Sequence, residues 1–243
     1  MKEYNTYIFD LYGTLVDIHT DETKKSFWKR MALYYTLNGA PYKGKELRKS
    51  YTKLVSKLEK KLQNEMDAKC VNGDKVEIDL LKVFEKLFEN KGVTPNREML
   101  EATAIMFRTL SIEHLKLFDD AKEMLCKLKQ AGKKIYLLSN AQAVFTIPEL
   151  KALGIYELFD GIMISSMAGV KKPANGFFEA LINKYDIDKS RAIMVGNDYY
   201  DDIMGATAYG LDSVYIDTPQ SRQFKEKLPE SCKQIKRISK LFA

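Results

Sequence analysis

One stretch near the start of the chain, residues 7–17, constrains the fold more than any other. An apolar run there ends abruptly on Asp10, and Gly13 and Thr14 follow at once. The aromatic and β-branched side chains of residues 4–9 predict a buried strand. Ligands of open α/β sheets bind at the carboxyl ends of strands, where Asp10 falls, and Gly13 permits a turn that points backbone N–H groups at a ligand. The alternative is a strand that ends in an Asx turn.

Strand and helix patterns alternate in the second half of the chain. Short apolar runs at 135–138, 161–165, 192–195 and 213–216 predict strands, and helical patterns separate them. This alternation predicts a Rossmann-like α/β core, in which a parallel sheet carries helices on both faces. The basic tail after Ser221 predicts a solvated final helix.

Four helical patterns without a convincing strand lie between the first strand and this region. They cover residues 23–37, 46–66, 77–90 and 96–110, and a turn is expected at 71–74. We therefore expect a helical module over 18–114, inserted into a core formed by 1–17 and 115–243. Polar segments at both joins predict that the module moves and excludes water from a site when it closes.

Composition excludes several classes of protein. No apolar run approaches the roughly 18 residues that span a bilayer, and the start leads directly into the first strand, which predicts no signal peptide. Three widely spaced cysteines, Cys70, Cys126 and Cys232, predict a reducing, cytoplasmic location. A net charge of +6 favours a small anionic ligand, and it gives little support for nucleic acid as a partner.

Polar residues also follow the later strands. Ser139 and Asn140 end the second strand, Lys172 precedes Pro173, and residues 196–202 read Gly-Asn-Asp-Tyr-Tyr-Asp-Asp. Each has an ordinary explanation, namely a helix cap, a solvent-facing lysine and an acidic helix start. However, three carboxylates within five residues repel each other unless a cation lies among them.

Taken in order, these stretches resemble the four motifs of the haloacid dehalogenase-like hydrolase superfamily. The resemblance implies that Asp10 is the nucleophile, that the Ser139 hydroxyl holds the transferred group, and that Lys172 keeps Asp10 ionised. It also implies that the inserted helices form a C1-type cap. The implied catalytic residues are Asp10, Tyr12, Thr14, Ser139 and Lys172, and the implied substrate-binding residues are Gly13, Ser139, Asn140 and Lys172.

The resemblance further implies a Mg²⁺ site. Asp10 and the backbone carbonyl of Tyr12 would be ligands, together with an acid of the fourth motif. Asn197 occupies the usual position of that acid, and the adjacent Asp198 is chemically the better ligand for a hard cation. The choice between Asn197 and Asp198 stays open, and Asp202 completes the metal candidates.

Tyr12 leaves the chemistry open, because most phosphatases of the superfamily carry a second Asp at this position. The D-x-Y-G-T form resembles the 2-haloacid dehalogenase branch instead. A tyrosine, with a pKa near 10, is a poor general acid for a leaving alkoxide. A halide leaves without a proton, so Tyr12 would not hinder a dehalogenase. That branch uses no metal and needs a cap arginine, for which Arg30 and Arg48 are candidates.

We favour a Mg²⁺-dependent phosphatase of a small phosphorylated metabolite, acting through an aspartyl phosphate on Asp10. The reason is that the acidic cluster, Asp198, Asp201 and Asp202, needs a cation. A metal-free 2-haloacid dehalogenase that forms an aspartyl ester is the alternative. A non-catalytic binding protein on the same fold is a third possibility, which the retention of Asp10, Ser139 and Lys172 argues against. The sequence does not specify the physiological substrate or the oligomeric state.

Overall fold

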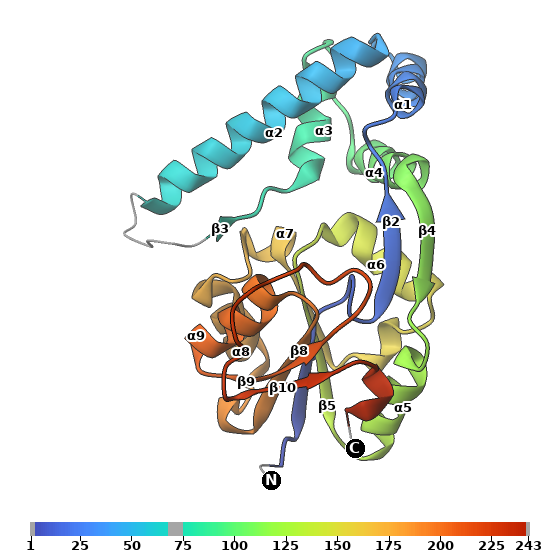
Figure 1. Cartoon of the computed structure of the whole chain (residues 1–243). Helices are drawn as coiled ribbons and strands as arrows, with labels where there is room; N and C mark the ends of the chain where they lie inside the picture. The colour runs from blue at the N-terminus through green and yellow to red at the C-terminus, as the bar shows by residue number, and fades with distance from the viewer. Residues whose placement is uncertain (1–2, 68–74, 242–243) are drawn as a thin grey trace.

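The computed structural model describes residues 3–67 and 75–241 and has two lobes (Figure 1). Cys70 and the turn expected at 71–74 therefore lie outside the described residues. The lower lobe contains a six-stranded sheet in the order β10-β9-β8-β1-β5-β6, and all of its strands pair in parallel. The strands are β1 (Thr6–Phe9), β5 (Lys134–Ser139), β6 (Gly161–Ile164), β8 (Ala192–Gly196), β9 (Asp212–Ile216) and β10 (Cys232–Ile235).

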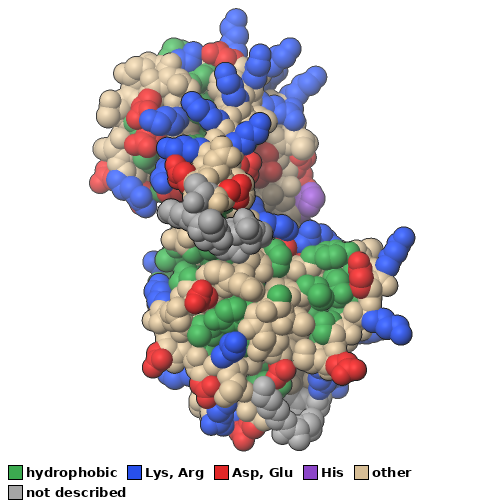
Figure 2. Space-filling view, turned by 90° about the vertical axis from the view of Figure 1, so that its left-hand side faces the viewer, with side chains coloured by type: hydrophobic (Ala, Val, Ile, Leu, Met, Phe, Trp, Pro, Cys, Tyr) green, Lys and Arg blue, Asp and Glu red, His purple; other side chains and the backbone are tan. Residues whose placement is uncertain are grey.

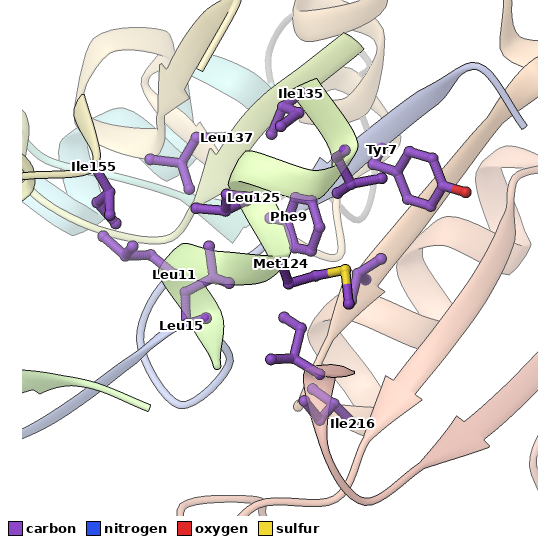
Figure 3. Packing of buried hydrophobic residues seen from close by; sticks show 14 of the residues in the cluster. Tyr7, Phe9, Leu11, Leu15, Met124, Leu125, Ile135, Leu137, Ile155 and Ile216 are labelled. Atoms are coloured by element: carbon purple, nitrogen blue, oxygen red, sulfur yellow. The ribbon is translucent and has the colours of Figure 1, made fainter. Parts of the chain in front are cut away.

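The side chains of each strand alternate between two apolar layers, as expected for a buried parallel sheet. Phe9 and Leu137 face α5 (Ala121–Gln130) and α6 (Ala143–Ala152), and Figure 3 shows part of this packing. The neighbouring residues of the same strands face α8 (Asn175–Tyr185) and α9 (Gly205–Tyr209) on the other side. The expected α/β core with helices on both faces is confirmed.

The upper lobe is a helical cap with a hydrophobic core of its own. It consists of α1 (Lys25–Leu37), α2 (Gly44–Asp67), α3 (Leu80–Glu89) and α4 (Arg97–Ser111), so the four expected helices are present. Trp28, Phe84 and Phe107 are buried among these helices. The basic side chains of α2 are exposed, and Figure 2 shows Lys and Arg spread over this lobe. They form the solvated helix face that is usual for such a charge pattern.

An antiparallel ribbon joins the two lobes. It pairs β2 (Val16–Thr20) with β4 (Ile112–Leu117), and Ile18 lies opposite Leu115. The expected polar joins without strands are wrong here, because both segments form strands. The hydrogen bonds of these segments are made across the ribbon, and the apolar side chains of Ile18, Leu115 and Leu117 pack against the core cluster.

The tail differs from its prediction as well. No helix forms directly after Ser221; instead an irregular loop leads to β10, and a short 3₁₀ turn, η4 (Ile238–Lys240), follows. The predicted helix is wrong because Ile235 and Ile238 are buried in the core cluster, and β10 extends the sheet beside β9.

Short elements complete the described fold. They are β3 (Lys75–Val76), η1 (Tyr156–Leu158), α7 (Ser165–Ala168), β7 (Val170–Lys171), η2 (Lys189–Arg191) and the π-helix η3 (Tyr199–Met204). Within the described residues, no helix combines the length and the apolar character needed to cross a bilayer.

Candidate active site

Asp10 lies at the carboxyl end of β1, between the ends of β5 and β8. Its backbone N–H donates to the Val195 carbonyl at 2.9 Å, which continues the pairing of β1 with β8 for one more residue. The side chain is largely buried, with 8% of the residue exposed, and it lines a pocket of about 240 Å³. A carboxylate in this position is shielded from bulk water but open to a small ligand.

Lys172 is fully buried against Asp10. Its ammonium group lies 2.7 Å from Asp10 Oδ1, 2.7 Å from Asp202 Oδ1 and 2.8 Å from the Leu138 carbonyl oxygen. Burial by itself would lower the pKa of Lys172, but the charges of Asp10 and Asp202 raise it above its ordinary value. The ammonium group of Lys172 thereby orients the Asp10 carboxylate.

Asp202 is the second buried carboxylate of this group. Burial raises its pKa, Lys172 opposes that shift, and the Asp10 carboxylate adds to it. Asp202 Oδ2 also accepts from the Asp198 N–H at 2.9 Å, which fixes the start of η3. A Cβ on Gly196 would lie 2.2 Å from Asp202 Oδ2, so only glycine fits where β8 passes this carboxylate.

Thr14 links the first and fourth motifs. Its hydroxyl oxygen lies 3.1 Å from both Asp10 Oδ2 and Asn197 Oδ1. Gly13 has a positive φ of 87°, and a Cβ there would lie 2.5 Å from Asn197 Nδ2. The Asn197 amide is thus packed directly against the loop that carries Asp10, which places Asn197 beside the predicted nucleophile.

Ser139 and Asn140 have different surroundings. The Ser139 hydroxyl is buried, lines the same pocket as Asp10 and has no hydrogen-bond partner among the described residues. The Asn140 amide instead holds the backbone of Lys172, since its Oδ1 accepts from the Lys172 N–H at 2.8 Å and its Nδ2 donates to the Lys172 carbonyl at 3.1 Å. Asn140 also lines the pocket.

The carboxylates of the acidic cluster pair with basic side chains of the protein itself. Asp198 accepts from the Tyr200 and Asp201 N–H groups and pairs with Arg222. Arg222 also lies 3.0 Å from Asp201, and Lys75 of the cap lies 3.6 Å from Asp201. The repulsion that the sequence suggested is therefore relieved by arginine and lysine. Within residues 3–67 and 75–241, no group of three or more His, Cys, Asp or Glu side chains is arranged to hold a metal.

Arg222 belongs to the loop after β9, and no pattern in the sequence indicates the role of this loop. Thr218 donates to the Gly13 carbonyl at 2.7 Å, and Gln220 donates to Asp17 Oδ1 at 2.5 Å in the ribbon. Gln220 and Arg222 both line the Asp10 pocket. The loop after β9 thus holds the first motif, the ribbon and the fourth motif together.

Tyr12 points toward α6 and the cap. Its hydroxyl donates to Glu149 Oε2 at 2.5 Å and lies 3.1 Å from Thr146 Oγ1. Arg108 of α4 donates from Nε to Glu149 Oε1 at 2.6 Å. Burial and the charge of Glu149 raise the pKa of Tyr12 above its ordinary value. The Tyr12 hydroxyl is therefore a weak acid, and its proton is already hydrogen-bonded to Glu149.

A second pocket of about 440 Å³ adjoins the first and shares Tyr12 and Asn140 with it. Arg108 lines this pocket and is the arginine that the cap places beside the site. The two candidate cap arginines of the sequence do not line either of these pockets: Arg48 lines a separate groove between α1 and α2, and Arg30 is exposed. Arg108 lacked a recognisable signal, since its partner Glu149 is 41 residues away in the chain.

Two curated proteins are similar to part of this chain. The ribulose-1,5-bisphosphate 5-phosphatase of Halopiger xanaduensis is 33% identical over 115 residues, which is 47% of this chain and 48% of that protein. The glyceraldehyde 3-phosphate phosphatase of Pyrococcus abyssi is 26% identical over 133 residues, 55% of this chain and 56% of that protein. The matched part of the chain thus spans about half the length of these relatives.

The fold as a whole has a match among solved structures. The 2-haloacid dehalogenase from Pseudomonas syringae pv. Tomato DC3000 superposes with a TM-score of 0.63 at 17% identity, over 99% of this chain and 96% of that chain. This likeness concerns the fold alone. The sequence model of haloacid dehalogenase-like hydrolases matches residues 4–210, which include Asp10, Ser139, Lys172 and the acidic cluster. The chain is therefore a member of the haloacid dehalogenase-like hydrolase family.

Proposed function

We propose that the chain is a Mg²⁺-dependent phosphatase of a small phosphorylated metabolite and that Asp10 is its nucleophile. The main support is the Ser139 hydroxyl, which is buried without a partner among the described residues and lines the pocket that holds Asp10 and Lys172. A buried polar group normally has a partner. A phosphoryl oxygen bound in this pocket would supply the missing hydrogen-bond acceptor.

In the proposed reaction, a carboxylate oxygen of Asp10 bonds to phosphorus while the bond from phosphorus to the ester oxygen breaks. The departing oxygen takes its proton from water, because the Tyr12 hydroxyl donates to Glu149. Water then attacks the phosphorus of the aspartyl phosphate, which releases phosphate and restores the Asp10 carboxylate. Lys172 holds Asp10 oriented throughout, through the contact of its ammonium group with Asp10 Oδ1.

The donors around Asp10 fit a magnesium ion. They are oxygens, as this hard cation requires: the Asp10 carboxylate and the Asn197 amide oxygen, which both lie 3.1 Å from the Thr14 hydroxyl. The family resemblance adds the backbone carbonyl of Tyr12. Asn197 is the better candidate of the two that the sequence left open, since Asp198 caps η3 and pairs with Arg222. When bound, Mg²⁺ would offset the negative charge of the phosphoryl group.

Calorimetry with Mg²⁺ tests this ligand set. Asn197→Ala should weaken binding by more than about tenfold, which is the loss that even an outer-shell substitution can cause. Asp198→Ala is the matched control and should bind with nearly wild-type affinity. If Asp198→Ala loses binding and Asn197→Ala does not, the neighbouring acid is the ligand instead.

The cap is proposed to cover residues 18–114 and the core 1–17 and 115–243. These boundaries fall within the β2–β4 ribbon, where Asp17 lies opposite Lys116 and Ile18 opposite Leu115. A two-stranded ribbon is a natural place for a hinge, and closure of the cap over Asp10 would exclude water.

A 2-haloacid dehalogenase is the second candidate, and Tyr12 favours it because a halide leaves without a proton. Arg108 would be its carboxylate-binding residue, but its charge is already paired with Glu149. The dehalogenase hypothesis therefore has less support than the phosphatase hypothesis. The two activities are separated by a screen of phosphate esters and 2-haloacids, each with Mg²⁺ and with EDTA.

In that screen, phosphate release that EDTA abolishes is the expected result. Halide release that persists in EDTA would replace the phosphatase proposal by the dehalogenase alternative. The absence of both activities would favour a non-catalytic binding protein.

A further inference from the structure

The cap reaches down to the loop that carries Lys172. β3 of the cap pairs antiparallel with β7, so that Lys75 lies opposite Lys171 and Val76 opposite Val170. The next residue, Glu77, donates its N–H to the Gly169 carbonyl at 2.9 Å. Figure 1 shows β3 below the cap helices, close to α7. Since β7 ends one residue before Lys172, the cap is bonded directly to the segment that delivers this ammonium group.

The Glu77 carboxylate reinforces this pairing. Its Oε2 accepts from the Ser165 hydroxyl at 3.0 Å, and its Oε1 accepts from Gln142 Nε2 at 3.2 Å. The Gln142 amide also accepts from the Leu80 N–H at 2.9 Å and donates to the Ile78 carbonyl at 2.8 Å. Glu77 therefore attaches the cap strand to two separate elements of the core, to α7 through Ser165 and to the start of α6 through Gln142.

The Lys172 loop is thus held from two directions. On the core side, the Asn140 amide forms two hydrogen bonds with the backbone of Lys172. On the cap side, β3 and Glu77 hold residues 169–171. Asn140 belongs to the same lobe as Lys172, whereas β3 belongs to the lobe on the far side of the ribbon. The cap contacts would therefore break if the cap moved away from the core.

We propose that Glu77 is a positioning residue: it fastens the cap strand to the Lys172 loop, so that closure of the cap completes the alignment of Lys172 with Asp10. This inference rests on the proposed function in treating Lys172 as catalytic. Glu77 contacts neither the substrate pocket nor Lys172 itself, and its effect passes through the β3–β7 pair. The strand pair thereby couples cap closure to the chemistry.

Kinetics of Glu77→Ala test the proposal. We expect kcat to fall about 10- to 100-fold, the effect of a displacement of roughly 1 Å at a catalytic group. KM should change much less, because the substrate pocket is intact. Glu77→Gln keeps an acceptor oxygen and should recover most of the lost rate. Ser165→Ala removes one of the same hydrogen bonds from the core side and should act in the same direction as Glu77→Ala.

The matched control is Glu101→Ala. It also removes a cap carboxylate, but the partner of Glu101 is Arg97 on the same helix, at 2.6 Å. This variant should retain wild-type kcat and KM. If Glu77→Ala behaves like Glu101→Ala, Glu77 does not position Lys172.

Amide hydrogen exchange gives a readout that does not depend on turnover. In Glu77→Ala, peptides covering 75–78 and 169–172 should exchange about tenfold faster than in the wild type, while Glu101→Ala should leave both unchanged. Unchanged exchange in Glu77→Ala would overturn the proposal even if wild-type phosphatase activity is present. If the wild type hydrolyses no phosphate ester, the proposed function fails separately, and faster exchange would still establish that Glu77 fastens the strand.

Discussion

Asp10→Asn should reduce phosphate release to less than about a hundredth of the wild-type rate, because an amide is not a nucleophile toward phosphorus. The substitution is nearly isosteric, and Asn can still accept a hydrogen bond from Lys172 or Thr14, which both contact Asp10. The fold should therefore survive, and the loss should appear in kcat. The measurement is steady-state phosphate release, with circular dichroism to verify the fold.

The control for Asp10→Asn is the same substitution at Asp160. This carboxylate accepts from the Ile135 N–H at 2.9 Å at the start of β5, the opposite end of the strand from Ser139. Asp160→Asn should cost some stability and leave kcat unchanged. A variant Asp10→Asn that keeps more than about a hundredth of the rate would mean that another group attacks phosphorus.

The residues that the structure brings together around Asp10 could largely be predicted from the sequence, for a geometric reason. Asp10, Ser139 and Asn197 each end or directly follow a parallel strand, and β8, β1 and β5 are neighbours in the sheet. The carboxyl ends of such strands share one edge, so polar residues after apolar runs must meet there. Lys172 required the family resemblance, because a lysine before a proline has no such signal.

The residues that the sequence could not reveal act through long-range ion pairs. Glu149 and Arg108 lie on different lobes, and Arg222 reaches Asp198 from a loop that resembles an exposed tail in its composition. No local periodicity marks such pairs. The same limit applies to the acidic cluster. Its negative charges are evident in the sequence, but its pairing with Lys172, Arg222 and Lys75 depends on the fold.

The ribbon illustrates a different limit. β2 and β4 carry charged and polar side chains, and pairs such as His114 with Asp17 form across the strands. A two-stranded ribbon exposes much of its surface, so the apolar alternation that marks a core strand is weak. The partner strand also lies nearly a hundred residues away, beyond the four cap helices.

Tyr12 leads to the second large expected effect, a steep dependence of the rate on the leaving group. The Tyr12 hydroxyl donates to Glu149, and burial raises its pKa, so Tyr12 is a poor acid for protonating a departing alkoxide. General acid catalysis typically contributes about 10²- to 10⁴-fold. Aryl and acyl phosphates should therefore react faster than alkyl phosphates by about that factor.

Two substitutions of Tyr12 decide whether this explanation holds. Tyr12→Asp places a carboxylic acid two residues after the nucleophile and should narrow the difference between aryl and alkyl phosphates. Tyr12→Phe keeps the ring and removes only the hydroxyl, so it should leave the dependence on the pKa of the leaving group unchanged, whatever it does to the contact with Glu149.

A steeper dependence in Tyr12→Phe would show that Tyr12 itself donates the proton. A flat dependence in the wild type would mean that a different residue supplies it. Turnover of 2-haloacids that Tyr12→Asp abolishes would instead support the dehalogenase, because the added charge beside Asp10 would repel a carboxylate substrate.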